Sequence, residues 1–277
     1  MTAPAATPIP PRGGRDLKSA VLVGVVLLGT ALLGLILWPW LIVALIVALL
    51  LAGVGEIATA VKGIGLDVPR PPLWAAAVGL PLAAYFGSIT GLFLALVGAL
   101  LLVCVWTELT RRRPAGQVIM AGMFAVMWAP FLLSFGVALL DQPRGNLMVA
   151  CLVLMVIAND TFGYIVGYRC GKHPIAPRIS PKKSWEGLAG SLAGAVIVGV
   201  VAVTLMVGHP WWIGALLGVF AVLAATCGDF SESMVKRELG IKDMSSLLPG
   251  HGGVMDRLDS LVFAAPVAYT FLALPLA

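Results

Sequence analysis

Residues 40–60 read WLIVALIVALLLAGVGEIATA, a run that holds a single charged residue, Glu56. A helix that crosses a bilayer needs about 20 largely apolar residues, so this segment alone predicts a membrane span. The rest of the chain is similar: 60% of its 277 residues are hydrophobic, 11% are charged, and the mean hydropathy is +1.01. Because a soluble domain carries about 25% charged residues, the composition excludes a soluble or a disordered protein.

Similar apolar runs recur along the chain and predict an all-α polytopic integral membrane protein with about nine transmembrane helices. The predicted spans are 19–37, 40–60, 73–86, 91–109, 116–140, 146–168, 187–208, 211–228 and 254–276. By composition the chain divides into a flexible basic tail at 1–18, an N-terminal multi-span region at 19–140 and a C-terminal multi-span region at 141–277. Nearly all concentrated polar chemistry lies in the last region, after residue 158.

Basic residues gather in alternate connections, which predicts the orientation of the chain. Sixteen of the 18 lysines and arginines lie in the N-terminal tail or in the connections at 61–72, 110–115, 169–186 and 229–253. Arg144 lies on the other side, and Arg257 begins the last span. The positive-inside rule places the N-terminus and the two longest connections in the cytoplasm, in a protein of the cell (plasma) membrane. The net charge of +5 therefore suits membrane lipids, and we expect no nucleic-acid partner.

Charged residues at membrane depth are costly, so polar clusters there need an explanation. In the sixth predicted span, Asn159 and Asp160 precede Gly163 and Gly167, whose spacing lets another helix approach closely. We interpret the Asn-Asp pair as part of a ligand or metal site, with a polar contact between helices as the alternative. The segment SPKKSWEG at 180–187 suits phosphate oxygens, since it combines two lysines with hydroxyl donors. A plain topology signal is its alternative reading.

Two more clusters flank the last connection. If helical, Asp229, Ser233 and Lys236 share one face, although an ordinary salt-bridged surface would look the same. The segment PGHGGVMDRLD at 249–259 places glycines directly before a helix whose free N–H groups favour anions. Asp256 and Asp259 lie three residues apart, hence on one helical face, and are expected to hold a divalent cation. Ligation by oxygen alone favours magnesium or manganese over zinc.

Other candidate residues receive no chemical role. Glu56 and Glu108 lie near span ends and are interpreted as helix-end pairs, and His173 and His209 are loop residues. The four cysteines contain no CxxC pair, so they indicate neither a disulfide framework nor a zinc site. Lysines, a glycine-rich segment and several carboxylates at one membrane face together suit phosphoryl or nucleotidyl transfer to a lipid.

The segment from Ser233 to Asp259 resembles the signature of phosphatidate cytidylyltransferases (CDP-diacylglycerol synthases). The resemblance rests on Ser233, Lys236-Arg237, Lys242-Asp243, Ser245 and the run LPGHGGVMDRLD at 248–259, with no departure from the pattern. The stretch at 180–187 and the Asn159-Asp160 pair are also similar to that family. The resemblance therefore covers about residues 155–260, with the specific signature at 233–259.

The resemblance implies transfer of CMP from CTP to phosphatidate with Mg²⁺ required, giving CDP-diacylglycerol and pyrophosphate in a C-terminal catalytic region. The implied catalytic residues are Asp229, Lys236, Arg237, Lys242, Asp243, His251, Asp256 and Arg257. The implied substrate-binding residues are Asn159, Ser180, Lys182, Lys183, Ser184, Glu186, Ser233, Gly252 and Gly253. Metal ligation falls to Asp229 and Asp256, with Asp160 and Asp259 as further candidates. A second cation and a homodimer are left open.

Two rival classes are less compatible with the sequence. A CDP-alcohol phosphotransferase would carry the run Asp-x-x-Asp-Gly-x-x-Ala-Arg, which is absent here. A transporter would place polar residues midway through discontinuous spans, usually in repeated halves. Here the polar residues gather at cytoplasmic span ends in one half of the chain.

Overall fold

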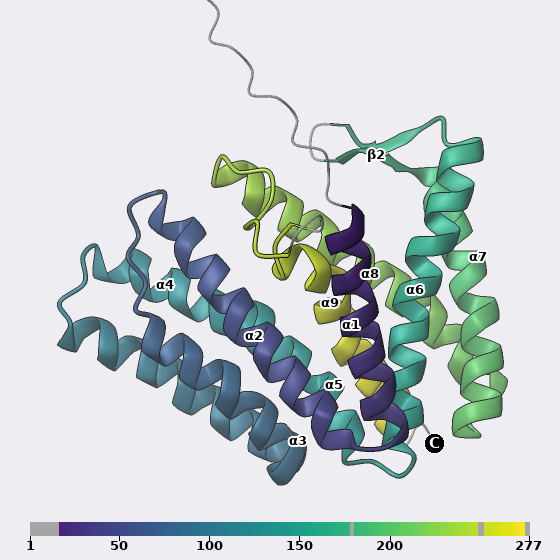
Figure 1. Ribbon diagram of the computed structural model, residues 1–277, viewed down its shortest axis with the longest axis horizontal. Coiled ribbons are helices and arrows are strands. Elements are labelled where there is room, and N and C mark those ends of the chain that lie inside the picture. Colours follow the sequence, from purple (N-terminus) through teal and green to yellow (C-terminus); the bar gives the residue numbers. More distant parts are fainter. Residues whose placement is uncertain (1–16, 178–179, 249–251, 275–277) are drawn as a thin grey trace, which may run out of the picture.

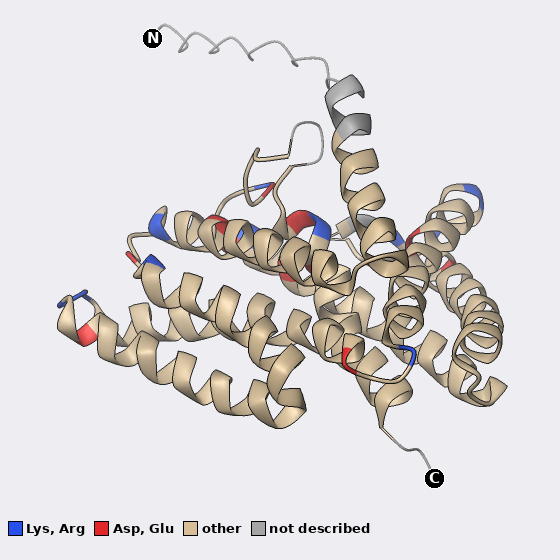
Figure 2. Ribbon diagram, turned by 60° about the horizontal axis from the view of Figure 1, so that its bottom comes forward, with Lys and Arg blue, Asp and Glu red and all other residues tan. Residues whose placement is uncertain are grey.

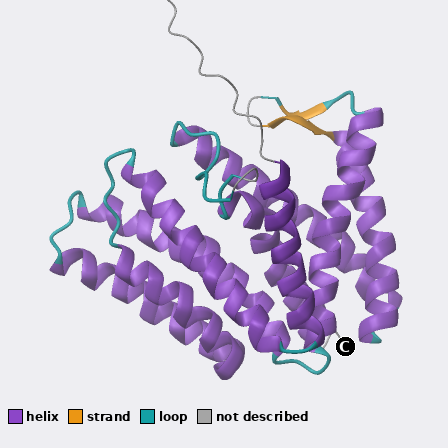
Figure 3. Ribbon diagram, viewed as in Figure 1, coloured by secondary structure: helices purple, strands orange, loops and turns teal. Residues whose placement is uncertain are grey.

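The computed structural model describes residues 17–177, 180–248 and 252–274, and almost all of them are helical (Figures 1 and 3). The helices are α1 (Leu17–Ile36), α2 (Pro39–Lys62), α3 (Arg70–Leu109), α4 (Ala115–Val126), α5 (Leu132–Leu140), α6 (Gly145–Cys170), α7 (Trp185–Ala202), α8 (Trp211–Glu238) and α9 (Met255–Ala273). Two π-helical turns, η1 (Met127–Phe131) and η2 (Val203–Val207), join α4 to α5 and extend α7. Each predicted span falls on one of these helical segments.

Within the described residues, six helical stretches are long and apolar enough to cross a membrane. They are Pro39–Lys62, Arg70–Leu109, Ala115–Leu140, Gly145–Cys170, Trp185–Val207 and Trp211–Glu238. The chain is therefore a helical, multi-pass membrane protein, in agreement with the sequence-based fold class. The distribution of charge in Figure 2 agrees with the apolar composition, since long stretches of helix carry no charged residue and charges concentrate near helix ends.

The helix α3 combines two of the predicted spans, 73–86 and 91–109, in one element of 40 residues. Its backbone is non-helical at Ser88, where φ is 56° and ψ is −164°. A small cavity of about 130 Å³ is lined by Ala76 and Gly79 from before this break and by Gly98 and Ala99 from after it. The two arms of α3 therefore lie antiparallel to each other and turn at Ser88. Small side chains on both arms allow this close approach.

Small residues also bring α6 and α7 together, as the Gly163–Gly167 spacing predicted. A Cβ atom added to Gly167 would lie 3.5 Å from the Cα of Gly187 at the start of α7, and one added to Gly163 would collide with Ser191. One buried core of apolar side chains extends from α2 to α9, so the division at residue 140 does not separate two cores. The N-terminal helices can therefore reach the polar residues of the C-terminal half.

The connections sort into two ends of the helix bundle. At one end, Arg112 pairs with Asp67, and these residues bring the 63–69 and 110–114 connections together. At the other end, the Arg144 guanidinium donates to the carbonyl of Val207 at 2.6 Å, and His209 lies 3.1 Å from the carbonyl of Leu272 near the end of α9. The isolated basic residue of the sequence analysis, Arg144, therefore lies opposite the basic connections.

The connection at 169–186 departs from the all-α expectation. It contains two antiparallel strands, β1 (Pro174–Ala176) and β2 (Ser180–Ser184), with Pro174 paired to Ser184 and Ala176 to Ser180. Glu186 fixes the base of this hairpin, since one carboxylate oxygen lies 2.6 Å from Nδ1 of His173 and the other accepts the backbone N–H groups of Lys172 and His173. The hairpin in turn positions the basic segment that precedes α7 (Figure 1).

The two ends of the bundle should differ in their access to a thiol reagent that cannot cross membranes. In a variant whose native cysteines are replaced, Gln142→Cys lies at the Arg144 end and should be labelled in intact cells. Ser246→Cys lies at the opposite end and should be labelled only after the cells are permeabilised. Labelling of both positions in intact cells would contradict a bilayer between them, and the reverse pattern would invert the orientation.

Candidate active site

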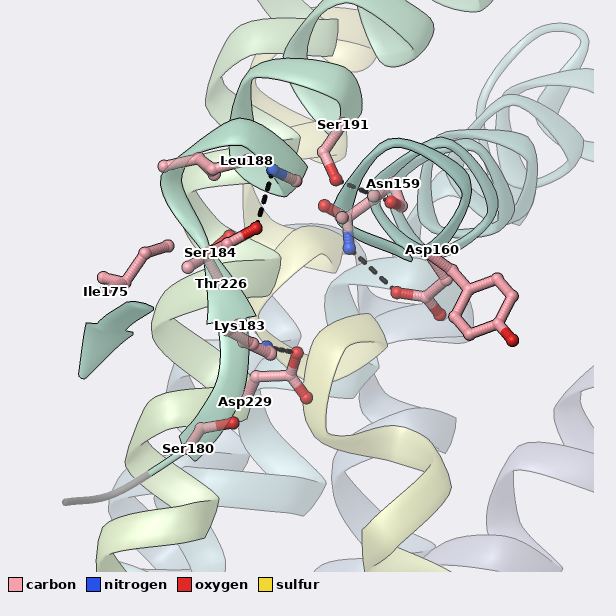
Figure 4. Close-up of a pocket in the computed structure, with 14 residues that line it drawn as sticks. Asn159, Asp160, Ile175, Ser180, Lys183, Ser184, Leu188, Ser191, Thr226 and Asp229 are labelled. Carbon is pink, nitrogen blue, oxygen red and sulfur yellow. Dashed lines mark hydrogen bonds and ion pairs between the residues drawn. The ribbon is translucent and has the colours of Figure 1, made fainter. Parts of the chain in front are cut away.

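A cavity of about 310 Å³ opens where α6, β2, α7 and α8 meet (Figure 4). Its lining consists of Asn159, Asp160, Gly163, Tyr164, Gly167, Ile175, Ser180, Lys183, Ser184, Gly187, Leu188, Ser191, Thr226 and Asp229. The volume lies at the lower end of the range typical for small-molecule sites, about 300–1,000 Å³. Two segments that the sequence analysis selected independently, the Asn159-Asp160 pair and the basic stretch at 180–187, thus form walls of the same cavity.

Hydrogen bonds fix the polar wall of this cavity. The Asn159 side chain donates to Asp160 at 2.9 Å, and the Ser191 hydroxyl donates to the Asn159 carbonyl at 2.7 Å. The Ser184 hydroxyl accepts the backbone N–H of Gly187 at 3.1 Å and so caps the start of α7. An N-cap of this kind holds the helix N-terminus, and its remaining free N–H groups, beside the cavity.

The charge of the cavity centres on Lys183. Its ammonium group pairs with Asp229 of α8 and lies 5.2 Å from the centroid of the Phe230 ring. Burial lowers the pKa of Lys183, while the nearby carboxylates of Asp259 and Asp160 act in the opposite direction. One lysine thus faces acidic side chains from three different helices. A cation-binding environment of this kind can hold phosphate groups only if further positive charge accompanies them.

A second charged centre lies between α8 and α9. The Lys236 ammonium donates to Glu232 and to Asp256, each at 2.7 Å, and all three side chains are at most 14% exposed. The second oxygen of Glu232 is buried without a hydrogen-bond partner among the described residues. Asp229, Ser233 and Lys236 all lie on the helix α8, as predicted. Asp229 pairs with Lys183 of β2, whereas Lys236 pairs with Asp256 of α9 and with Glu232 of α8 itself.

The backbone around Gly252 and Gly253, directly before α9, is held by Asp256. One oxygen of this carboxylate accepts the backbone N–H groups of Gly253 and Met244, at 2.8 and 2.9 Å. Gly252 adopts φ of +86°, a conformation that glycine enters without strain. A Cβ atom on Gly253 would lie 2.8 Å from the Glu56 carboxylate and 2.9 Å from the Asp256 carboxylate. Gly252 is therefore favoured by its backbone conformation, and Gly253 by the close approach of two acids.

Glu56 is a site residue that sequence reasoning missed. Its side chain on α2 is buried, and it accepts the Ser245 hydroxyl at 2.5 Å and the backbone N–H groups of Val254 and Met255 at 2.8 and 2.9 Å. The expected helix-end pairing applies to Glu108, which lies 3.6 Å from Arg113, but not to Glu56. Glu56 instead caps the N-terminus of α9, where a carboxylate is most stabilising.

The remaining predicted residues lie at the same end of the bundle with different roles. Arg237, Lys242, Asp243 and Arg257 are exposed around the second charged centre, and Ser233 is half-buried on α8. Glu186 holds the base of the hairpin and does not line the cavity. Predictions for His251 and for the side chain of Lys182 fall outside the part of the chain that the structure describes.

The acidic residues are of the ligand type that suits a magnesium ion, but they do not form a complete coordination sphere. Among the described residues, no group of three or more His, Cys, Asp or Glu side chains surrounds a common point. The available donors are nevertheless carboxylate oxygens, which Mg²⁺ prefers, and one buried oxygen of Glu232 lacks a partner. Mg²⁺ often takes only one or two protein carboxylates and completes its shell with substrate phosphates and water.

Comparison with known proteins identifies relatives along nearly the whole chain. The sequence model of the cytidylyltransferase family matches residues 18–275. A phosphatidate cytidylyltransferase of Mycobacterium bovis is 40% identical over 281 residues, which cover 95% of this chain and 90% of the relative. The phosphatidate cytidylyltransferase of Mycobacterium leprae is 37% identical over 288 residues, which cover 95% of this chain and 90% of the relative. That of Brucella abortus is 35% identical over 202 residues, which cover 73% of this chain and 72% of the relative.

The Glu56 carboxylate should be required for the stability of the segment that precedes α9. In Glu56→Gln an amide group replaces one of the accepting oxygens and faces a backbone N–H group, so that at least one buried hydrogen bond is lost. Lost hydrogen bonds to a charged group are worth about 1.5–3 kcal/mol, and we expect the Tm in detergent to fall by about 5 °C or more.

The same variant should be cleaved faster by protease within residues 239–254. Glu108→Gln is the matched control, because it removes a surface pair 3.6 Å apart and should change the Tm by little. An unchanged Tm and cleavage rate in Glu56→Gln would show that the carboxylate does not hold the segment.

Proposed function

Because this chain belongs to the cytidylyltransferase family, we propose how its residues carry out the reaction for which its relatives are named. The chain transfers CMP from CTP to phosphatidate, which yields CDP-diacylglycerol and pyrophosphate. The observation that carries our assignment of the site is the cavity at Lys183 and Asp229, which adjoins the Lys236–Asp256 centre at one end of the bundle. Both charged centres are therefore assigned to one active site.

The reaction needs no nucleophile from the protein. A phosphate oxygen of phosphatidate forms a new bond to the α-phosphorus of CTP, and the bond from that phosphorus to the oxygen of the β-phosphate breaks. The phosphate monoester is already mostly ionised near neutral pH, so no base has to remove a proton from it. Catalysis then consists of bringing two anions together, holding them in line and neutralising the charge that develops on the leaving pyrophosphate.

Lys183 is assigned to contact a substrate phosphate in the cavity, and Ser180 and Ser184 supply hydroxyl groups beside it. Lys236 is held by two carboxylates and orients Asp256, while the exposed Arg237, Lys242 and Arg257 meet the triphosphate from the aqueous side. Gly252 and Gly253 let the backbone approach the nucleotide, together with His251. Asn159 and Ser233 complete the predicted substrate contacts.

We assign Mg²⁺ to Asp229, with Asp160 and Asp259 as alternative candidates for a second ligand, because each of these acids acts on the same lysine, Lys183. Asp256 is also a candidate ligand, although its oxygens already accept Lys236 and two backbone N–H groups. A bound Mg²⁺ supplies neutralisation of phosphate charge and orientation of the triphosphate. Asp229 pairs with Lys183 in the structure, so an ion held by Asp229 would replace the ammonium group as its partner and would leave Lys183 available to a substrate phosphate.

The orientation follows from the basic connections. We assign nine crossings, counting the two arms of α3 separately, with the N-terminus and the active site on the cytoplasmic face of the plasma membrane. Support comes from the placement of Arg144 at the end opposite the 63–69 and 110–114 connections. This orientation gives the site direct access to CTP in the cytoplasm and to phosphatidate in the inner leaflet.

Purified protein in detergent with CTP, phosphatidate and Mg²⁺ should form CDP-diacylglycerol and release pyrophosphate in equal amounts. Product is measured from radiolabelled CTP after lipid extraction, and pyrophosphate by a coupled assay. EDTA should abolish both signals and added Mg²⁺ should restore them. Full activity in EDTA would remove the metal from the proposal, and pyrophosphate without lipid product would contradict transfer to phosphatidate.

Neutralising the acids should separate metal ligation from positioning. Asp229→Asn and Asp256→Asn keep side-chain size but lose charge, and each should reduce turnover by about 100-fold or more, as expected when a major electrostatic contact is lost. For Asp229→Asn we also expect that more Mg²⁺ is needed for half-maximal rate.

Asp141→Asn is the matched control, since Asp141 is exposed near Arg144 at the opposite end and should have no effect. Protein yield and Tm in detergent report folding of each variant. Near-normal turnover of Asp256→Asn at saturating Mg²⁺ would exclude Asp256 from the catalytic site, and an unchanged Mg²⁺ requirement in Asp229→Asn would exclude Asp229 as a ligand.

A further inference from the structure

A second, larger hollow lies outside the active-site cavity. It has a volume of about 630 Å³ and opens between α2, the start of α3 and the connection at 244–247. It shares no lining residue with the cavity at Lys183. The reaction described above leaves this groove without a role, although one of its walls is the connection that Glu56 holds.

The part of the groove near Thr59 and Arg70 carries positive charge. The Arg70 guanidinium donates to the Thr59 hydroxyl at 3.2 Å, and among the described residues no carboxylate lies within 4.0 Å of it. A neighbouring hollow of about 260 Å³ shares Arg70 and is also lined by Lys62 and Arg112, against one acid, Asp67. The exposed hydroxyl of Ser246 lies on the groove wall. An anion with several oxygen acceptors would be favoured here.

The part of the groove that lies towards Leu51 on α2 is largely apolar. Leu51 lies eight residues before Thr59 on α2, which places it about 12 Å further along the helix axis. Trp74 follows Arg70 by one turn of α3 and is 43% exposed, and Leu247 on the opposite wall is 57% exposed. Tryptophan with an exposed ring near a basic residue is typical of the membrane interface. The lining of the groove thus changes from polar and basic residues, which suit a phosphate group, to apolar residues, which suit an acyl chain.

We propose that this groove binds an anionic phospholipid of the bilayer with a phosphodiester headgroup, such as phosphatidylglycerol, separately from the lipid that reacts. The phosphodiester contacts Arg70, Thr59 and Ser246, and the first part of an acyl chain lies along Leu51, Trp74 and Leu247. The occupant therefore touches the 244–247 connection, whose residues line the groove and not the cavity at Lys183.

The charges in the groove favour a phosphodiester over the phosphate monoester of the substrate. A diester carries one negative charge, which matches the single guanidinium of the groove. The Glu56 carboxylate also lies on the groove wall, where it accepts three hydrogen bonds from the connection and the start of α9. Its charge disfavours a second negative charge nearby, as a monoester near neutral pH would bring.

Brominated lipids test this site, because bromine quenches the fluorescence of a tryptophan that it contacts. The full chain is placed in phosphatidylcholine vesicles with rising fractions of brominated phosphatidylglycerol, and brominated phosphatidylcholine serves as the reference. The contribution of Trp74 is the difference between the wild type and Trp74→Phe. Quenching of this contribution should show about a fivefold preference for brominated phosphatidylglycerol over brominated phosphatidylcholine. This preference is equivalent to roughly 1 kcal/mol, as expected for one basic residue at the surface.

Arg70→Gln, measured against Arg70→Gln/Trp74→Phe, should lower this preference to about one. Arg111→Gln is the matched control, since Arg111 is an exposed basic residue at the same end that does not line the groove, and it should keep the fivefold preference. Equal quenching of wild-type Trp74 by both lipids, or equal loss in Arg111→Gln, would overturn the site. Stronger quenching by brominated phosphatidate than by brominated phosphatidylglycerol would assign the groove to the substrate and overturn the diester proposal.

Discussion

The carboxylate of Glu56 connects α2 to the segment before α9 across 189 to 199 residues of sequence. A charged group at membrane depth cannot rely on water for its hydrogen bonds, so the protein must supply the donors. Glu56 takes them from the N-terminus of α9 and from Ser245, and Asp256 takes its own from the same segment and from Lys236. Because of this requirement, Glu56 of the largely apolar N-terminal half is hydrogen-bonded to the polar residues of the C-terminal half.

The glycine-rich segment follows from the same requirement. Two carboxylates lie close to Gly253, and each must come close enough to accept backbone N–H groups. A side chain at this position would push the acids apart and leave buried donors without partners, which costs about 1–3 kcal/mol for each group. Gly253 is therefore needed first for the fold of this backbone, independently of any contact with a nucleotide.

The elements that could be predicted from the sequence are those marked by residues within the element itself. Apolar runs located the helices because each span must be apolar throughout its own length, and the cavity walls at Asn159-Asp160 and 180–187 were found because polar residues there are conspicuous. Glu56 was misjudged because its partners lie in a distant segment. The strands at 174–176 and 180–184 were missed because Pro and Lys are poor strand formers, and Glu186 holds their base from the following helix. The turn of α3 at Ser88, in contrast, falls in the gap between the predicted spans 73–86 and 91–109, directly after Gly87.

The balance of charge within the site gives a reason for a metal ion that does not depend on relatives. Around Lys183 and Lys236 the described residues place five acidic side chains, Asp160, Asp229, Glu232, Asp256 and Asp259. The two lysines already pair with Asp229, Glu232 and Asp256, and the triphosphate and the lipid phosphate add further negative charge. The exposed Arg237, Lys242 and Arg257 offset part of this excess from the aqueous side, where solvent and salt weaken their effect. A divalent cation held by these acids would supply positive charge within the site, where the low dielectric makes it most effective.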